Sequence, residues 1–175
     1  MGGSPRTSEI TVMHRYLIAL GSNVRHMRYG APRQVIEAAL VSLAEYGIHI
    51  ECRSRVIASL PIGPSLREYA NAAAVVSAPY DPPEMLARLK AMEADFGRRA
   101  GGKRWGARVL DLDLILWDGG IWASPGLSIP HPAFRERDFV LRPAAQIAPD
   151  WRDPFTGLCV RHLFARLTRK GTAPR

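Results

Sequence analysis

Two aspartates separated by a single residue, Asp111 and Asp113, carry the clearest chemical signal in the sequence. They lie within residues 109–117, an otherwise apolar run that predicts a β-strand. Successive side chains of a strand point to opposite faces, so both carboxylates are expected on one face and four leucines on the other: Leu110, Leu112, Leu114 and Leu116. Two carboxylates beside open positions suit Mg²⁺, whose octahedral shell phosphate oxygens complete. The alternative for this spacing alone is an edge strand with a solvated outer face.

Basic side chains flank this strand on both sides in the sequence. Upstream, residues 97–107 contain four glycines and no acidic residue, which predicts a mobile basic loop. The flanking residues with chemical potential are Arg98, Arg104, Trp105 and Arg108 before the strand, and His131, Arg135 and Arg137 after it. Carboxylates that hold Mg²⁺ among arginines suit phosphoryl-type transfer, so a nucleoside triphosphate is the expected ligand. The absence of GxxxxGK(S/T) and GxGxxG motifs argues against a P-loop or a dinucleotide-binding fold.

The composition is that of a globular chain of 175 residues, with 47% hydrophobic residues, 23% charged residues and a net charge of +8. Of the 24 basic residues 21 are arginine, which suits phosphate binding and also nucleic-acid binding. No apolar run approaches the ~20 residues of a membrane span, and the first residues lack the apolar stretch of a signal peptide. Cys52 and Cys159 are too few for a disulfide scaffold and lack metal-ligand spacing. We therefore expect a cytoplasmic protein with no membrane partner.

The elements that must position these residues follow from hydrophobic spacing and turn residues. The sequence predicts strands at 16–20, 49–57, 69–77 and 109–117, and helices from Pro32 to Gly47 and from Asp81 to Phe96. This βαββαβ order predicts an α+β fold of ferredoxin-like type, an antiparallel sheet with two helices packed on one face. C-terminal additions are expected beyond it: a short strand at 127–129 and helical segments at 143–147 and 160–167.

From about Arg15 to Trp151, the chain resembles the 6-hydroxymethyl-7,8-dihydropterin pyrophosphokinases of folate biosynthesis. The resemblance is carried by residues 18–23 (IALGSN), 69–73 (YANAA), Glu93, 96–98 (FGR), 104–113 (RWGARVLDLD), 129–132 (IPHP) and 137–141 (RDFVL). It implies a ferredoxin-like α+β fold and transfer of the β,γ-diphosphate of ATP to the hydroxymethyl group of the reduced pterin, with release of AMP.

The resemblance also implies which residues bind ATP and metal. Asp111 and Asp113 would hold two Mg²⁺ ions that bridge the ATP phosphates, and Arg98 and Arg108 would contact the phosphates as further catalytic residues. The implied ATP site consists of Arg98, Arg104, Trp105, Arg108, the backbone of Leu114, His131 and Arg137. Without the resemblance, His131 beside two prolines could equally be a hydrogen-bonding loop residue. Trp105 in its glycine-rich segment is expected to belong to a lid that closes over the substrate.

The implied pterin site combines aromatic residues that contact the faces of the pterin ring with polar groups that contact its edge. Tyr69 and Phe139 would flank the ring, Asn71 would hydrogen-bond its edge, and the backbone of residues 59–62 would line the pocket, with Ser59, Leu60 and Ile62 as the contact residues. Stacking between two aromatic rings and an amide's donor and acceptor suit a flat heterocycle. From the residues alone, the two aromatics could instead be core residues and the asparagine a turn cap.

Departures from the family pattern are Ala100, Gly126, Pro132 and Lys90, where relatives commonly carry arginine, arginine, an aromatic residue and glutamine, respectively. Two other functions fit the fold: a different Mg²⁺-dependent nucleotidyl, phosphoryl or glycosyl transferase, and an RNA-binding ferredoxin-like module, which needs aromatics exposed on central strands. We expect a flexible leader (residues 1–14), one pyrophosphokinase domain (15–168) and a flexible tail (169–175). The expected partners are the small molecules ATP and pterin, and no nucleic acid is expected. We expect the protein to be a monomer.

Overall fold

The computed structural model describes residues 11–59, 69–97 and 108–171, and the sheet core lies entirely within them. In chain order the elements are β1 (His14–Ser22), α1 (Pro32–Ser42), the 3₁₀ helix η1 (Leu43–Tyr46), β2 (His49–Arg53), β3 (Ile57–Ser59), β4 (Tyr69–Ala78), α2 (Pro82–Asp95), β5 (Asp111–Trp117), β6 (Trp122–Ser124), β7 (Leu127–Ile129), the 3₁₀ helix η2 (Phe134–Glu136), α3 (Asp138–Ile147) and α4 (Val160–Gly171).

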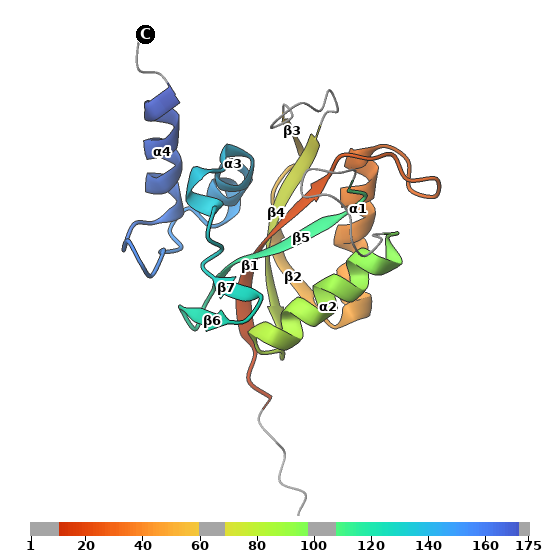
Figure 1. Ribbon diagram of the computed structural model, residues 1–175, viewed down its shortest axis with the longest axis horizontal. Coiled ribbons are helices and arrows are strands. Elements are labelled where there is room, and N and C mark those ends of the chain that lie inside the picture. Colours follow the sequence, from red (N-terminus) through yellow and green to blue (C-terminus); the bar gives the residue numbers. More distant parts are fainter. Residues whose placement is uncertain (1–10, 60–68, 98–107, 172–175) are drawn as a thin grey trace, which may run out of the picture.

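In the described part of the chain, five strands form one antiparallel sheet (Figure 1). The order is β2-β4-β1-β5, and β3 also pairs with β4. With α1 and α2 as the two crossovers, this order is the βαββαβ topology of the ferredoxin-like fold. The predicted α+β class is therefore confirmed.

The strand expected over residues 49–57 is interrupted. β2 ends at Arg53 and β3 begins at Ile57, and both pair with successive parts of β4. Between them the Ser54 hydroxyl accepts a hydrogen bond of 3.0 Å from the Ala73 amide, in place of a backbone carbonyl. The side chain thus replaces one rung of the ladder, which a pattern of apolar residues cannot reveal.

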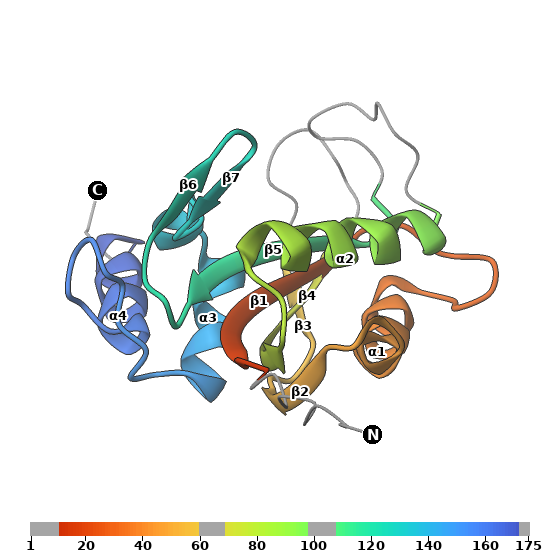
Figure 2. The same cartoon turned by 90° about the horizontal axis from the view of Figure 1, so that it is seen from below.

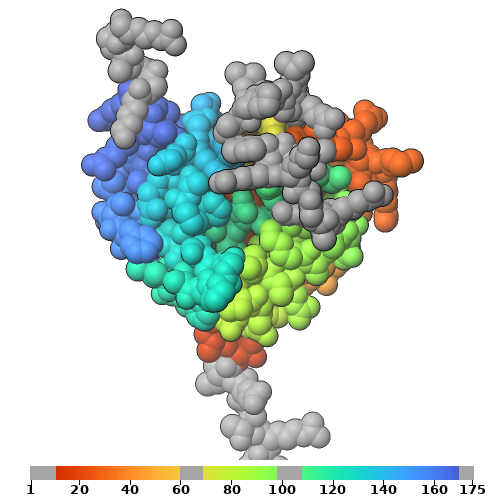
Figure 3. Space-filling view, viewed as in Figure 1, coloured from red at the N-terminus to blue at the C-terminus, as the bar shows by residue number. Residues whose placement is uncertain are grey.

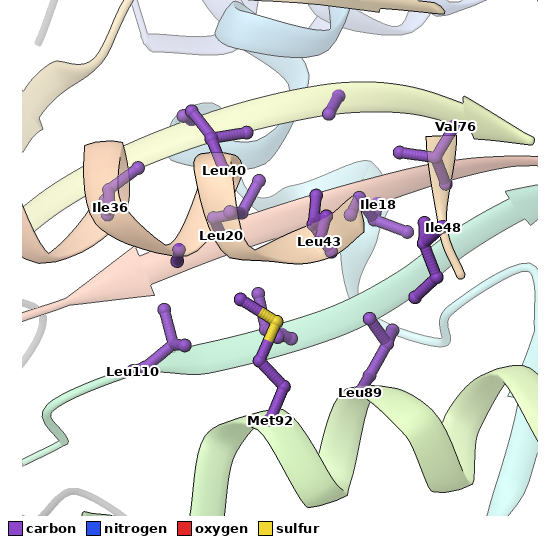
Figure 4. Close-up of a cluster of buried hydrophobic side chains, with 14 of the residues drawn as sticks. Ile18, Leu20, Ile36, Leu40, Leu43, Ile48, Val76, Leu89, Met92 and Leu110 are labelled. Atoms are coloured by element: carbon purple, nitrogen blue, oxygen red, sulfur yellow. The ribbon is translucent and has the colours of Figure 1, made fainter. Parts of the chain in front are cut away.

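α1 and α2 cover one face of the sheet, and the space between them is filled with apolar side chains (Figure 4). α2 begins where expected, because the Asp81 carboxylate accepts a hydrogen bond of 2.9 Å from the Glu84 amide and caps the helix. These apolar side chains, from the two helices and the sheet face beneath them, form a first hydrophobic cluster. Its largest fully buried side chains include Tyr16, Ile18, Leu20, Ile36, Leu43, Ile48, Met85, Leu89, Met92 and Leu110.

α3 covers the opposite face of the sheet, and α4 packs against α3 on the side away from the strands (Figures 1 and 2). The C-terminal segments, coloured cyan to blue, occupy one whole side of the space-filling view (Figure 3). The second cluster is built from Leu17, Val75, Ile115, Leu116, Phe134, Val140, Leu141, Val160 and Leu163, among others. The C-terminal additions expected from the sequence thus form the second layer of the domain.

The register between β1 and β5 shifts by one residue, because Leu17 pairs with Leu116 whereas Ile18 pairs with Leu114. Ile115 and Leu116 are therefore both buried in the second cluster. The expectation that Leu116 shares a face with Leu110, Leu112 and Leu114 is wrong, because a β-bulge breaks the alternation at this point.

Other boundaries also differ from the sequence pattern. α3 begins at Asp138, five residues before the expected segment at 143–147, and Pro143 lies inside it. The hairpin strand β6 was not expected, whereas β7 matches the predicted strand. Within the residues described, no helix is long and apolar enough to cross a membrane.

Candidate active site

The register of β4, β1 and β5 brings Asp111, Gly21 and Asn71 into one row. Gly21 pairs with Asp111 on β5 and with Asn71 on β4. Side chains of directly paired residues project to the same face, so the carboxylate and the amide lie on either side of the glycine. A Cβ atom added to Gly21 would lie 3.6 Å from Asn71 Oδ1 and 3.9 Å from Asp111 Cβ. The missing side chain leaves space between the two polar groups.

The next row along the strands has a carboxylate on one side only. Ala19 pairs with Asp113 on one side and with Ala73 on the other. In each row the residue of β1 beside the aspartate is small, Gly21 beside Asp111 and Ala19 beside Asp113. Asp111 and Asp113 are each partly exposed, whereas Leu110, Leu112 and Leu114 are buried against α2. The two carboxylates therefore share the face opposite to α1 and α2.

Arg108 is held at the start of β5 by the turn that follows β1. Its amide donates a hydrogen bond of 2.7 Å to Asn23 Oδ1, and its carbonyl accepts one of 3.0 Å from the Asn23 amide. Its guanidinium forms an ion pair with Asp111. Because Asn23 is buried, this pair of hydrogen bonds fixes the backbone from which Arg108 reaches the carboxylate.

α2 holds the outer edge of β5 between the two aspartates. The buried Glu93 carboxylate accepts a hydrogen bond of 2.7 Å from the Leu112 amide. Lys90 Nζ lies 2.8 Å from Glu93 Oε1 and 3.4 Å from the Leu112 carbonyl oxygen. A buried carboxylate is tolerated when it is paired and hydrogen-bonded, and here both partners also fix the strand. Glu93 and Lys90 therefore set the position of the residue that separates Asp111 from Asp113.

His131 follows the cis peptide bond between Ile129 and Pro130, and its amide donates a hydrogen bond of 3.1 Å to the Ile115 carbonyl. Burial lowers the pKa of His131 and the Arg137 guanidinium lowers it further, against the opposing effect of the Asp113 and Asp111 carboxylates. The ring is therefore neutral at pH 7. Nδ1 accepts a hydrogen bond of 3.2 Å from the Ala133 amide, so the proton is on Nε2, which can donate to a ligand.

Arg137 and Phe139 lie at the start of α3. The Arg137 guanidinium carbon is 5.8 Å from the centroid of the Phe139 ring. Phe139 is partly buried and packs against the second cluster. The helix start thus brings one cation and one aromatic ring to the same face of the sheet as Asp111 and Asp113.

Ser59, Tyr69 and Asn71 come together where β3 pairs with β4. Ser59 pairs with Tyr69 in the register, and Asn71 Nδ2 donates a hydrogen bond of 2.7 Å to Ser59 Oγ. Asn71 is buried, whereas Tyr69 is only partly so. The structure thus brings three of the residues assigned to the pterin site into direct contact or pairing.

Leu114 is the remaining expected ATP-site residue that the structure describes. Its side chain is buried in the first cluster, so only its backbone can face a ligand. Among the described strands β5 is an edge strand that pairs with β1 alone, which leaves its outer edge available at this position. Five residues expected in the site or its lid lie outside the described residues: Leu60, Ile62, Arg98, Arg104 and Trp105.

Asp111 and Asp113 place two partly exposed carboxylates on this face. Within residues 11–59, 69–97 and 108–171 no group of three or more His, Cys, Asp or Glu side chains could hold a metal ion. A site of two carboxylates suits Mg²⁺, which keeps waters and takes substrate phosphates as its other ligands.

Sequence reasoning missed the positioning roles of Asn23, Lys90 and Glu93. Asn23 and Glu93 appear in the motifs of the resemblance, and Lys90 was noted as a departure. Their partners lie 85 residues away for Asn23, 22 for Lys90 and 19 for Glu93. No local pattern indicates such pairings.

The RNA-binding alternative requires an open sheet face with exposed aromatics. α1 and α2 bury one face, and α3 buries much of the other. The open part of the second face carries Asp111 and Asp113, and the aromatic side chains Tyr69 and Phe139 are both partly buried.

Together, fold and site define a ferredoxin-like α+β domain whose second sheet face carries paired carboxylates, an arginine and a neutral histidine. Residues 17–149 match the family model of 7,8-dihydro-6-hydroxymethylpterin-pyrophosphokinase (HPPK). The chain belongs to this family, which confirms the family expected from the sequence.

Relatives from several bacteria are named 2-amino-4-hydroxy-6-hydroxymethyldihydropteridine pyrophosphokinase. The protein from Synechocystis sp. is 36% identical over 154 residues, which cover 88% of this chain and 76% of that protein. The protein from Pseudomonas aeruginosa is 34% identical over 145 residues (82% and 86%). The protein from Methylorubrum extorquens is 34% identical over 161 residues (91% and 97%).

Solved structures of Plasmodium falciparum HPPK-DHPS have the same fold. One of them, a triple mutant, superposes with a TM-score of 0.71 at 15% identity, and the match covers 93% of this chain and 46% of that chain. The wild-type protein superposes with a TM-score of 0.68 at 14% identity. This chain therefore spans less than half the length of those chains.

Proposed function

We propose that this protein transfers the β,γ-diphosphate of ATP to the hydroxymethyl group of 6-hydroxymethyl-7,8-dihydropterin and releases AMP, as a step of folate biosynthesis. Membership of the HPPK family over residues 17–149 supports this reaction. The observation that carries it is the row in which Asp111 and Asn71 face one another across Gly21. A phosphate-binding end and a heterocycle-binding end then lie on the same face, one glycine apart.

At the phosphate end, Asp111 and Asp113 would hold two Mg²⁺ ions. Bound there, Mg²⁺ would neutralise charge on the phosphate oxygens during transfer. Arg108 would contribute a fixed cation beside Asp111, and Arg137 a second one at the start of α3. Neutral His131 would donate a hydrogen bond from Nε2 to a phosphate oxygen. Arg98, Arg104 and Trp105 would complete this end from the segment before β5.

The ATP adenine would lie along the outer edge of β5, where the backbone of Leu114 would bind it. At the other end of the face, Tyr69 and Phe139 would flank the pterin ring, and Asn71 and Ser59 would read its polar edge, with Leu60 and Ile62 lining the pocket. Asn71 already donates to Ser59, so its amide is oriented before the pterin arrives. Preorganised polar groups reduce the ordering cost of binding.

Catalysis in this scheme rests on positioning and electrostatic stabilisation, as is general for phosphoryl-type transfer. The sheet holds both carboxylates, Asn23 fixes Arg108, and Glu93 with Lys90 fixes the strand segment between the carboxylates. The hydroxymethyl oxygen would be brought in line with the β-phosphorus between the two ends of the face.

The test is to incubate the protein with ATP, Mg²⁺ and the reduced pterin and to separate the nucleotide products. Accumulation of AMP together with the pterin diphosphate is the expected result. Accumulation of ADP would indicate a single-phosphate transfer and would contradict the proposal, as would the absence of pterin-dependent turnover. Asp113→Asn serves as the inactive control.

We also propose that a single domain, residues 15–168, carries this activity as a monomer in the cytoplasm, and that its partners are the small molecules ATP and pterin. Light scattering after size-exclusion chromatography tests the monomer, and fractionation of cells that express the protein tests its location. A dimer that persists on dilution, or recovery in the membrane fraction, would contradict this proposal.

A further inference from the structure

The segment from His131 to Arg137 connects two side chains of the proposed nucleotide site. At one end, the His131 amide is tied to β5 by its hydrogen bond of 3.1 Å to the Ile115 carbonyl. Within the segment, the Phe134 amide donates to the His131 carbonyl (3.2 Å) and the Arg137 amide to the Phe134 carbonyl (3.3 Å). These bonds make the segment one compact turn, so a shift of its middle displaces both His131 and Arg137.

The middle of this turn is attached to a distant part of the chain through Arg135. Its Nε lies 2.7 Å from Asp153 Oδ2 and its terminal nitrogen lies 2.5 Å from Asp153 Oδ1. The guanidinium also lies 4.7 Å from the centroid of the buried Phe134 ring and 5.6 Å from that of Phe155. A two-point ion pair between aromatic rings fixes the direction of the arginine as well as its position.

Asp153 is fully buried, and its four polar contacts occupy both carboxylate oxygens. Besides Arg135, the Thr156 hydroxyl donates to Oδ2 (2.6 Å) and the Phe155 amide donates to Oδ1 (3.2 Å). Burial alone would raise the pKa of Asp153, but hydrogen bonds from Arg135, Thr156 and Phe155 outweigh it and lower the pKa, so the carboxylate stays charged at neutral pH. The side chain is therefore a rigid, charged anchor in the loop between α3 and α4.

We propose that Asp153 is a positioning residue of the nucleotide site: through Arg135 it holds the 131–137 turn, and with it His131 and Arg137, against β5. The inference rests on the proposed function, because it assigns His131 and Arg137 to the ATP phosphates. Asp153 touches neither ligand. It couples the loop before α4 to the nucleotide end of the sheet face, while the pterin contacts on β3 and β4 are independent of it.

Asp153→Asn tests this inference, because it keeps the side-chain shape while it removes the charge and turns one acceptor into a donor that faces Arg135. The matched control is Asp150→Asn in the same loop, since Asp150 is exposed and pairs with Arg161 at 2.7 Å on the surface. The probe is α,β-methylene-ATP with Mg²⁺, in which the bond to be broken is replaced. Calorimetric titration gives its Kd for each variant, and the chemical shifts of the His131 ring report the position of the turn.

For Asp153→Asn we expect the Kd of the nucleotide analogue to rise at least tenfold and the His131 resonances to move. We expect the Kd of the pterin alone to rise less than that of the nucleotide analogue, because only Phe139 among the proposed pterin residues follows the turn, and we expect Asp150→Asn to match the wild type in every measurement. Asp153→Asn with a lower melting temperature but unchanged nucleotide Kd and His131 shifts would overturn the inference, because the ion pair would then be only structural.

If Asp153→Asn does not fold, Thr156→Val tests the same inference, because it removes a single hydrogen bond to the same carboxylate. A raised nucleotide Kd for Thr156→Val supports the inference, and an unchanged Kd overturns it. A wild-type protein that does not bind the nucleotide analogue would contradict the proposed function itself, which separates the two failures.

Discussion

The two faces of the central sheet are built from the same strands but differ in how their side chains fill space. On the face under α1 and α2, Ile18, Leu20 and Leu112 belong to a continuous apolar cluster. On the opposite face the strands carry large apolar residues toward one end and small or polar residues toward the other. Leu17 and Val75 pack under α3, whereas Ala19 and Gly21 lie beside Asp113 and Asp111.

This difference shows that the candidate site depends on small residues beside the two aspartates as well as on the charged groups. Large side chains on the first face exclude water and stabilise the sheet. On the second face, Gly21 leaves room for at least a methyl group between Asn71 and Asp111, whereas Ala19 and Ala73 of the next row are buried in the second cluster. The first face should therefore set stability and the second should set activity, and the following substitutions separate the two.

Asp113→Asn is expected to have the largest effect. Activity should fall about 1,000-fold, which corresponds to about 4 kcal/mol in the barrier, because one ligand of the proposed metal site loses its charge. The melting temperature should change by only a few degrees, since the side chain is partly exposed. Asp111→Asn should behave similarly, although it also removes the ion pair with Arg108. Steady-state kinetics at saturating Mg²⁺ and calorimetry measure both quantities, and more than about a tenth of wild-type activity would refute the metal assignment.

Leu112→Ala lies one residue away on the other face and should have the opposite signature. Removal of a fully buried leucine should lower the free energy of unfolding by about 3 kcal/mol. The backbone at this position is held by β1 and by Glu93, so the folded fraction should keep most of its activity. Urea unfolding and kinetics well below the melting temperature make the comparison. A collapse of turnover in fully folded Leu112→Ala would show that the two faces do not act independently.

Phe139→Ala should weaken pterin binding about tenfold, or about 1.4 kcal/mol, because stacking is lost on one side of the ring. ATP-analogue binding should change much less, and stability should fall only modestly because the ring is partly buried. Calorimetric titration with each ligand distinguishes the effects. An equal loss of both affinities would assign Phe139 to the core rather than to the pterin site.

Gly21→Ala should have the smallest effect. It tests whether the absence of a side chain at this position matters for substrate binding. The new methyl group would make ordinary contacts, 3.6 Å from Asn71 Oδ1 and 3.9 Å from Asp111 Cβ, so the fold should be unchanged. It would narrow the space between the two ends of the site, and the pterin KM should rise about fivefold, or about 1 kcal/mol. An unchanged KM at unchanged stability would mean that substrates do not cross this row.

Local sequence patterns predicted the βαββαβ order because strands and helices repeat their apolar residues at fixed periods. The Asp81 cap, the start of α2 and the shared face of Asp111 and Asp113 all follow from neighbours within a few residues. Boundaries failed where a distant group intervened. The Ser54 hydroxyl interrupts the strand beside Ala73, and the bulge opposite Leu17 turns Leu116 to the other face.

The sequence by itself determined which residue types could do chemistry here and, through ordered motifs, the family to which the chain belongs. Only the tertiary structure decided how they are held. Asn23 meets Arg108 across 85 residues, Glu93 meets Leu112 across 19, and Arg135 meets Asp153 across 18. These contacts form only when the strands pair and the helices and loops pack together, because each joins groups that no helical or strand period brings together. That α3 packs on the same sheet face as the two aspartates likewise became visible only in the folded structure.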